Sequence, residues 1–454
     1  MILHHRGRAV GTRGVTVAAA ISGLLAVFML TAGALASPAS RTSPAPGEPE
    51  RFECSRIAMG TKARVVAWAG DREEARRAAE AALDRLTELD AILSDWSATS
   101  ELSRFVAKAG SGEVTLSPDL ASALEQAQRF ALLTDGAFDP TVGPVVRLWR
   151  ASRAAGTSPD PAALDEARSR IGWRRLSVDR SRAVAALEAG TLIDLGAIGK
   201  GIAADEMLAT LRAAGIESVL VDVGGSIRLG AAPPGRADWS VAATVDGARY
   251  DTILASDVGI ATSGDLEQVS IVDGVRLSHI IDPRTGEPLK EAPSVTVIAP
   301  DATTADALST ALSVLGVAEG RALVESLGAA ALVTGPAFSG IGATSVALGA
   351  LPAGCTWPAF ETARAANARE HVHEHADGDD VKEGLGDPIV EQAPEREQLG
   401  MDSFVRARRG GEALALEIAT WTMRPVVGEG PTIRLVGVTH VAEQAYYEDL
   451  AARL

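Results

Sequence analysis

The chain has 454 residues, of which 46% are hydrophobic and 22% charged, and its formal net charge is −16. This length predicts more than one folded unit, and the composition is typical of a globular chain and not of a disordered one. The 59 acidic residues outnumber the 43 basic ones, and no long basic tract lies in the body of the chain, so general nucleic-acid binding is disfavoured. Any phosphate-bearing ligand must therefore be held by a few local groups.

The N-terminus has the pattern of an export signal. Three arginines precede an apolar run from Val15 to Leu35, and Ala34-Leu35-Ala36 offers a small-x-small cleavage site. The run is also about long enough to span a bilayer, so an uncleaved anchor associated with the membrane is the alternative. We expect residues 1–36 to direct the chain to the periplasm or the extracytoplasmic face of the membrane. Residues 37–50, rich in Pro, Ser and Ala, are predicted to be a linker.

The main domain is predicted over residues 51–357 and begins with a strand and two helices. The stretch "RIAMGTKARVVAW" (56–68) has strand character. In "REEARRAAEAALDRLTELDAIL" (72–93), small and apolar side chains return to one helical face, namely those of Ala75, Ala79, Leu83, Leu86 and Leu89. A second helix is predicted in "SPDLASALEQAQRFALLTDG", with Ser117 as its N-cap and Gly136 as its C-terminal stop.

From Trp173 onward, short β-rich runs are separated by only a few Gly, Asp or Pro residues, which favours antiparallel hairpins. Further helices are predicted at residues 200–214, 304–315 and 317–327. The expected fold is therefore α+β, with mixed, largely antiparallel sheets and flanking helices. The β-rich runs are "RRLSVD", "AVAAL", "SVLVDVGGSIRLG", "DWSVAATV", "DTILA" and "GVRLSHIID".

The C-terminal part changes composition after Trp357. Residues 358–400 are charged, poor in large apolar side chains and contain "HVHEHADGDD", which indicates a flexible acidic linker, with a histidine metal tract as the alternative. Residues 401–454 are predicted to form a small α/β tail. Its strands are expected in "LALEIATWTM" and "TIRLVGVTHVA" and its helix in "EQAYYEDLAARL". This tail faintly resembles the opening of a TraB/GumN-type domain.

The chain has two cysteines, Cys54 and Cys355, near the two ends of the main domain. In an oxidising compartment they could form a disulfide. Spacing alone does not show proximity, so two unrelated thiols are the alternative.

The stretch "GAIGKG" places Lys200 among glycines where a helix is predicted to begin. It is not a triphosphatase phosphate loop, because Asp194 stands where the first glycine should be and Gly201 follows the lysine. The glycines at 196, 199 and 201 would still let the backbone approach an anion at the start of the helix. Ordinary turn chemistry is the alternative.

Two further stretches carry candidate chemistry. In "TTADALSTAL", where Thr303 or Thr304 is the expected helix cap, Asp306 and Thr310 stand four residues apart and share one helical face. Such an oxygen pair suits magnesium, although an acidic residue near a helix N-terminus is also favoured by the helix dipole. In "SHIIDPRTGEPL", His279 is a candidate general base, with a structural histidine at a strand end as the alternative.

Eight short blocks follow one another along the chain. They are "MGT" (59–61), "LSDWSATSELSRF" (93–105), "DGAFDPTVGP" (135–144), "IDLGAIGKGIAAD" (193–205), "DVGGSIRLG" (222–230), "ATSGD" (261–265), "HIIDPRTG" (279–286) and "ADALSTAL" (305–312). In this order the blocks resemble the ApbE-like FAD:protein FMN transferases. The resemblance covers roughly residues 51–350, and the order of the blocks makes it far more specific than any single block.

The resemblance implies an enzyme that binds FAD and Mg²⁺, transfers FMN to a threonine hydroxyl of an acceptor redox protein and releases AMP. It implies magnesium ligands at Ala197, through its carbonyl oxygen, at Asp306 and at Thr310. It makes His279, or less readily Asp282, the base. A protein that only carries FAD and an FAD pyrophosphatase are the alternatives. The positions expected to contact FAD are Met59, Trp96, Ala137, Phe138, Asp139, Asp194, Lys200 and Ile280.

Overall fold

The computed structural model describes residues 49–244, 250–264, 269–290, 292–335, 345–374, 406–410, 413–417, 421–423 and 433–435. The predicted export signal, most of the linker that follows it and the predicted terminal helix at 443–454 lie outside these residues. The prediction of a signal or anchor at 1–36 therefore stays a prediction.

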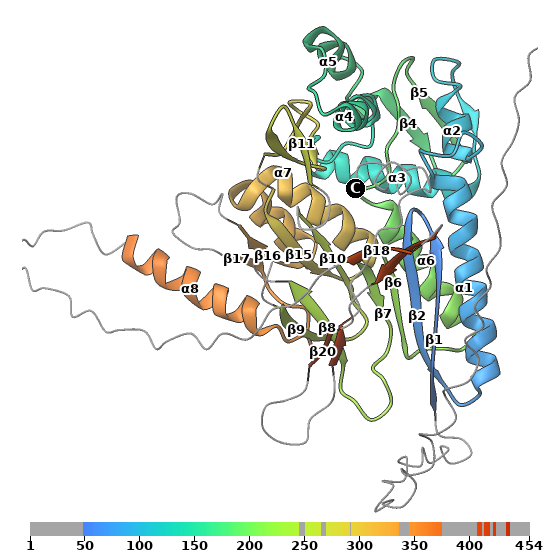
Figure 1. Ribbon diagram of the computed structural model, residues 1–454, viewed down its shortest axis with the longest axis vertical. Helices are drawn as coiled ribbons and strands as arrows, with labels where there is room; N and C mark the ends of the chain where they lie inside the picture. The colour runs from blue at the N-terminus through green and yellow to red at the C-terminus, as the bar shows by residue number, and fades with distance from the viewer. Residues whose placement is uncertain are drawn as a thin grey trace, which may run out of the picture. The chain divides into compact units, whose positions relative to one another are not determined.

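The centre of the fold is an eight-stranded sheet in the order β1-β2-β6-β7-β10-β15-β16-β17 (Figure 1). Every neighbouring pair in it is antiparallel, which confirms the predicted α+β fold with largely antiparallel sheets. The strands are β1 (Glu50–Ala58), β2 (Thr61–Ala69), β6 (Val219–Val223), β7 (Ser226–Leu229), β10 (Gly259–Ser263), β15 (Ser294–Ala299), β16 (Ala330–Thr334) and β17 (Ser345–Gly349).

Smaller sheets flank the central one, and most are the hairpins that the short β-rich runs predict. Each of them is antiparallel, and only a few turn residues separate the paired strands, except where Val114–Thr115 pairs with Val184–Leu187. They are β3 (Val114–Thr115) with β5 (Val184–Leu187) and β4 (Leu176–Asp179), β8 (Trp239–Thr244) with β9 (Tyr250–Ala255), β11 (Val269–Val272) with β12 (Val275–Ser278), and β13 (Ile281–Asp282) with β14 (Glu287–Pro288).

Helices cover the sheet unequally on its two faces. Alternate residues of each central strand point to opposite sides, and on one side they pack against α1, α6 and α7 (Figure 1). On the other side they pack against β8, β9 and α8. The helices are α1 (Arg72–Leu93), α2 (Glu101–Val106), α3 (Pro118–Leu133), α4 (Gly143–Ala155), α5 (Pro161–Arg168), the 3₁₀ turn η1 (Trp173–Arg175), α6 (Gly199–Ala213), α7 (Ala302–Ser326) and α8 (Pro358–Glu374).

The predicted helices form where their patterns indicate. All five residues named for the apolar face of α1 are buried. Helix α3 begins after Ser117, whose hydroxyl accepts the N–H of Leu120 at 3.2 Å, and it ends at Leu133, three residues before the predicted glycine stop. That glycine, Gly136, has φ +84° and donates its N–H back to the Ala131 carbonyl at 2.9 Å, so it still terminates the helical hydrogen bonding.

Helix α7 joins the two helices predicted at 304–315 and 317–327. The two arms meet at Gly316, whose φ of 73° and ψ of −173° are not helical. The helix begins at Ala302, and its cap is Asp301, whose carboxylate accepts the N–H of Thr304 at 2.7 Å. The prediction of Thr303 or Thr304 as the cap is therefore wrong, because an acidic side chain just before them already accepts that N–H. Among the described helices, α7 alone is long and apolar enough to span a membrane, and more than half of that apolar stretch is buried in the domain.

The prediction of a flexible linker at residues 358–400 is wrong for its first part. Residues 358–374 form α8, because Phe360 and Ala363 are buried against the sheet and Phe360 stacks on Trp357 with 6.0 Å between ring centroids. The rest of that acidic segment, including most of the histidine-rich tract, lies outside the described residues.

In the tail, β20 (Trp421–Met423) pairs with β21 (Ile433–Leu435), as predicted. The first half of the same predicted run, β19 (Ala413–Glu417), instead pairs with β18 (Arg406–Gly410), for which no strand was expected.

The two cysteines are separate thiols. Cys54 packs against the cluster on the helical face of the sheet, and Cys355 packs against the cluster on the opposite face. The sheet therefore stands between them, and the disulfide that the sequence left open is not formed.

Candidate active site

The site is built where the beginning of α6 crosses the beginning of α7. At the crossing, Gly201 of α6 lies so close to α7 that an added Cβ would come within 2.4 Å of the Ala302 carbonyl oxygen and 2.7 Å of the Thr303 Cα. Only glycine fits there, since real Cβ atoms do not approach other heavy atoms so closely. The glycine-rich stretch thus serves the packing of two helices as well as the formation of a turn.

Asp205 of α6 fixes the first turn of α7. Its carboxylate accepts the N–H of Ala302 at 3.0 Å, the N–H of Thr303 at 2.8 Å and the Thr303 hydroxyl at 2.6 Å. Arg228 of β7 lies 3.0 Å from the same carboxylate. Burial raises the pKa of Asp205, while the hydrogen bonds from Thr303 and Ala302 oppose that rise. A side chain of one helix therefore caps another helix, which a sequence-local capping rule does not find.

Asp306 lies on the first turns of α7 and faces α6. Its side chain is only 6% exposed, and its Oδ2 accepts the backbone N–H of Gly201 at 2.9 Å. Lys200 lies beside it, with Nζ 3.6 Å from Oδ1 of Asp306 and donating to the Gly196 carbonyl at 3.2 Å. Because the Lys200 side chain is still 30% exposed, its ammonium group lies at the edge of the site and can reach a ligand.

The magnesium prediction names three oxygen donors, which are the side chains of Asp306 and Thr310 and the carbonyl of Ala197. Gly201 gives its N–H to Asp306 and not to the carbonyl four residues earlier, and within the described part of the chain no N–H donates to the Ala197 carbonyl. Thr310 lies one turn after Asp306, and its hydroxyl is 3.2 Å from the Ser263 hydroxyl. The set of one carboxylate, one carbonyl and one hydroxyl consists of hard oxygens, as magnesium prefers. Among the described residues no three His, Cys, Asp or Glu side chains gather as a metal cage.

Asp194 lies just before this crossing and is held by a cation. One oxygen accepts the Gly196 N–H at 2.8 Å, and the other accepts from the Arg150 guanidinium at 3.0 Å. Burial raises the pKa of Asp194, and the neighbouring carboxylate of Asp95 raises it further, while Arg150 lowers it. Arg150 also bonds to Asp95 and lies 4.2 Å from the ring centroid of Trp96, a residue that is 75% exposed.

The loop between α3 and α4 packs beside Asp194. Ala137 and Phe138 are buried, and the Phe138 ring lies 6.0 Å from that of Phe130, so their side chains belong to the core. Both oxygens of Asp139 are used inside the protein, by the Thr141 N–H and hydroxyl and by the Trp173 N–H. Burial raises the pKa of Asp139 against these hydrogen bonds. The side chains of these three predicted positions are therefore engaged inside the protein.

An open cavity of about 530 Å³ adjoins this loop. Asp139 and Trp173 line one part of it, and Pro283 and Arg284, next to the candidate base Asp282, line another. Two blocks that are far apart in the sequence thus border the same cavity.

Helix α4 and helix α7 hold the loop that carries His279 and Asp282. From α4, Trp149 donates its indole N–H to the Gly286 carbonyl at 2.9 Å, and Arg153 donates to the Ser278 carbonyl at 2.9 Å. His279 is exposed, directly after the fully buried Ser278, and Ile280 is buried.

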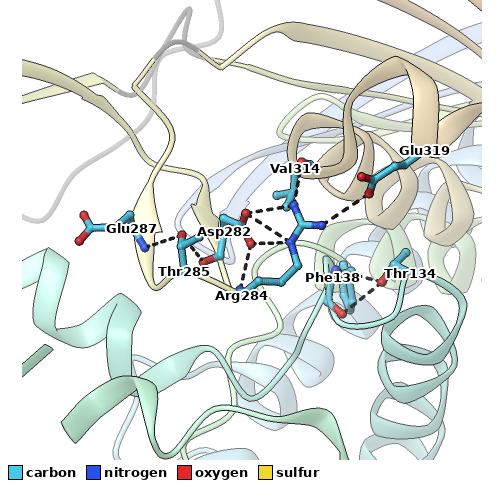
Figure 2. Close-up of polar contacts among 8 residues, drawn as sticks. All are labelled: Thr134, Phe138, Asp282, Arg284, Thr285, Glu287, Val314 and Glu319. Carbon is cyan, nitrogen blue, oxygen red and sulfur yellow. Dashed lines mark hydrogen bonds and ion pairs between the residues drawn. The ribbon is translucent and has the colours of Figure 1, made fainter. Parts of the chain in front are cut away.

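Asp282 is paired with Arg284 at 3.1 Å (Figure 2). The same guanidinium donates to the Val314 carbonyl at 3.3 Å and lies 3.6 Å from Glu319, which ties the loop to α7 beside its break (Figure 2). Asp282 is therefore engaged with a cation, whereas His279 lies at the surface.

Met59 lies apart from these contacts, in the turn between β1 and β2. It has φ 52°, an uncommon value for a residue with a side chain. Its N–H donates to the carboxylate of Asp90 at 3.0 Å, which fixes the turn against the last turns of α1.

A continuous series of contacts joins four of the predicted site residues, namely Trp96, Asp194, Lys200 and Asp306. It runs from Trp96 through Arg150 to Asp194, then through Gly196 to Lys200 and on to Asp306, with Thr310 one turn further. The predicted positions outside this series are Met59, Ala137, Phe138, Asp139, Ala197, Ile280, His279, Asp282 and Thr310. The sequence analysis missed two residues of the site. Arg150 belongs to no recognised motif, and Asp205 ends the block "IDLGAIGKGIAAD" but has no role that its sequence neighbours indicate.

The fold and this site match one family. The model of the ApbE family matches residues 59–333, which is more than half of the chain. A curated relative named FAD:protein FMN transferase, from Treponema pallidum, is 35% identical over 293 residues, covering 60% of this chain and 81% of the relative. One of the same name from Salmonella typhimurium is 35% identical over 285 residues, with the same coverage.

Solved structures agree with these relatives. The flavin transferase ApbE from Vibrio cholerae matches with a TM-score of 0.59 and 29% identity, over 69% of this chain and 99% of that one. The flavinyl transferase ApbE from Pseudomonas stutzeri matches with a TM-score of 0.58 and 26% identity, over 69% and 97%. Fold and relatives together define an enzyme of the transferase class. The chain belongs to the ApbE family.

Proposed function

We propose that this protein is an exported FAD:protein FMN transferase that depends on magnesium. It moves the FMN part of FAD onto a threonine hydroxyl of an acceptor redox protein and releases AMP. The observation that carries the proposal is the series of contacts that unites Asp194, Lys200 and Asp306 at the crossing of α6 and α7, with Thr310 one turn after Asp306. The relatives that bear the name of this activity support it.

The diphosphate of FAD is the part of the substrate that this crossing would bind. Lys200 would neutralise one charge of the diphosphate, since an ammonium group on a flexible stem suits a phosphate oxygen. The positive end of the α6 helix dipole would favour an anion there as well. Lys200 would then exchange its contact with Asp306, 3.6 Å away, for a contact with the ligand.

Ala197, through its carbonyl, Asp306 and Thr310 would hold the magnesium ion. The residues fit it, because Oδ1 of the buried Asp306 has only Lys200 as a partner among the contacts described and the Ala197 carbonyl receives no N–H from the described residues. Magnesium bound there supplies charge neutralisation for the diphosphate and for the AMP leaving group.

His279 would act as the general base. The threonine oxygen forms a bond to the FMN phosphorus, the bond from that phosphorus to the oxygen of the AMP phosphate breaks, and the hydroxyl proton passes to the imidazole. Asp282 suits this role less, because Arg284 occupies both of its oxygens at 3.1 Å. An exposed histidine also remains within reach of a protein acceptor.

Export of the protein rests on the arginines and the apolar run of the first 36 residues. Cell fractionation of the full chain, followed by N-terminal sequencing, tests it. A mature N-terminus near Ser37 supports a cleaved signal, an intact N-terminus in the membrane fraction supports an anchor, and a full-length cytoplasmic protein contradicts export.

The activity is tested by incubating the purified protein with FAD, Mg²⁺ and a candidate acceptor redox protein, and then measuring the intact mass of the acceptor. An added mass equal to FMN, together with free AMP, supports the transfer. Free FMN and AMP without an adduct would mean that the protein hydrolyses FAD. Unchanged FAD, with an acceptor that is known to accept FMN, would mean that the protein only carries FAD. Replacing the acceptor threonine by valine is the control, since it removes only the attacking oxygen.

A further inference from the structure

Trp96 is an exposed aromatic side chain that is nevertheless held in place. The residue is 75% exposed, yet the Arg150 guanidinium lies over its ring, 4.2 Å from the centroid. A guanidinium over one face of an indole is an attractive contact. Because the cation covers one face and most of the side chain is exposed, the opposite face is open to solvent.

Arg150 is itself fixed from two sides. It bonds to Asp95, the residue directly before Trp96, and to Oδ2 of Asp194 at 3.0 Å. The Asp194 side chain is only 11% exposed, and its other oxygen accepts the N–H of Gly196. A planar guanidinium held by two carboxylates keeps one orientation, and so does the ring that lies against it.

Arg150 therefore connects two parts of the site that are far apart in the sequence. One part is the segment of Asp95 and Trp96 after α1, and the other is the segment from Asp194 to Lys200 at the beginning of α6. Arg150 comes from a third element, α4, whose neighbouring residues Trp149 and Arg153 hold the loop of His279.

We infer that Arg150 is a positioning residue for FAD. It holds the Trp96 ring so that the open face of the ring is a stacking surface for an aromatic ring of FAD. It also keeps this surface at a set distance from the diphosphate-binding segment. The inference rests on the proposed function, because it takes FAD as the substrate. A stacking surface that is already ordered binds more tightly than a mobile one, since less conformational entropy is lost on binding.

The test measures binding of FAD directly, by flavin fluorescence anisotropy in EDTA and without an acceptor, so that no transfer occurs. We expect Arg150→Met to weaken FAD binding about tenfold, from the combined loss of the cation and of the ordered ring. Arg150→Lys should bind with intermediate affinity, because an ammonium keeps the charge and loses the planar fork. If Arg150→Met does not fold, Arg150→Lys carries the comparison.

Arg147→Met is the matched control. Arg147 lies one turn earlier on α4, is exposed and has no ion pair or hydrogen bond through its side chain with the described residues. Its replacement should leave FAD affinity unchanged, while it removes the same charge from the same helix.

A double-mutant cycle distinguishes positioning of Trp96 from a general structural effect. If Arg150 acts through the ring, Arg150→Met should weaken binding by no more than about twofold in a Trp96→Ala background. In turnover with an acceptor, KM for FAD should rise while kcat stays within about twofold, because the interaction is present in the ground state and the transition state alike.

Equal FAD affinity of Arg150→Met and the wild-type protein would overturn the inference, and so would fully additive effects in the cycle. A wild-type protein that does not bind FAD at all would overturn the proposed function together with the inference. The two failures are therefore distinguishable from the wild-type measurement alone.

Discussion

The backbone N–H of Gly201 donates to Oδ2 of Asp306 at 2.9 Å, so the helix that carries Lys200 and the helix that carries Asp306 are bonded to each other at the site itself. The bond leaves Oδ1 of Asp306 beside Lys200 at 3.6 Å. One carboxylate thus has a structural oxygen and a second oxygen that faces the proposed ligands.

Replacing Asp306 by Ala should abolish turnover, with a loss of at least about 10²-fold in kcat, because both the proposed metal ligand and the charge disappear. Thr310→Val should require a higher Mg²⁺ concentration for half-maximal rate, and Thr310→Ser should restore the wild-type value because it keeps the hydroxyl. Initial rates against Mg²⁺ concentration measure this. An Asp306→Ala variant that stays active without added metal would contradict the magnesium assignment.

Gly201→Ala should destabilise the protein by about 1–3 kcal/mol, because the new Cβ would overlap the Ala302 carbonyl oxygen of α7. Gly199→Ala is the matched control on the same helix, where the nearest atom to an added Cβ is 4.0 Å away. Urea denaturation of both variants gives the free energies of unfolding. Equal stability of the two variants would mean that α6 can move away from α7 without cost.

His279→Ala should lower kcat by about 10²–10⁴-fold, the usual range for loss of a general base. Asp282→Asn should keep kcat within about tenfold, because the Asp282 carboxylate is paired with Arg284 and serves the shape of the loop (Figure 2). The transfer rate at saturating FAD and acceptor compares the two variants. The reverse order of effects would make Asp282 the base.

The pair of Arg85 and Asp119 gives a pH dependence to stability. Hydrogen bonds from the Arg85 guanidinium, at 2.7 and 2.9 Å, hold the pKa of Asp119 below its ordinary value of 3.8. Because the pKa of Asp119 is lowered in the folded state, its carboxylate adds to the free energy of unfolding. This contribution is full above pH 3.8 and is lost as the pH falls through the folded-state pKa. Asp119→Asn should therefore cost about 1 kcal/mol at pH 7, a value discounted for solvent exposure, and less at pH 3.

Urea denaturation at both pH values tests this prediction. Asp165→Asn is the control, since the Asp165 side chain is 75% exposed and pairs with Arg168 at 3.3 Å. An Asp119→Asn effect that is the same at pH 7 and pH 3 would show that the ion pair does not contribute.

Unfolding the protein in iodoacetamide without reductant should alkylate both Cys54 and Cys355, because the sheet separates the two thiols. Intact mass should show two added carbamidomethyl groups. A mass with none, which becomes two after reduction, would mean that a disulfide does form.

The sequence by itself determined the family, the antiparallel hairpins and the helices, because hydrophobic period, cap residues and turn residues act over a few neighbouring positions. The periodic face of α1 and the Ser117 cap are of this kind. The ordered motif blocks likewise pointed to Asp194, Lys200, Asp306 and Thr310, although no single block was specific.

Only the tertiary structure decided how these residues meet. Asp205 caps a helix that begins 97 residues later in the sequence, and Arg150 joins Asp95 to Asp194 from a third element. The placement of Phe138 in the core, the pairing of Asp282 with Arg284 and the order of residues 358–374 depend equally on distant neighbours. A local pattern carries no information on such contacts, because the packing of distant elements decides which side chain enters the core, which side chains pair and which one caps a helix.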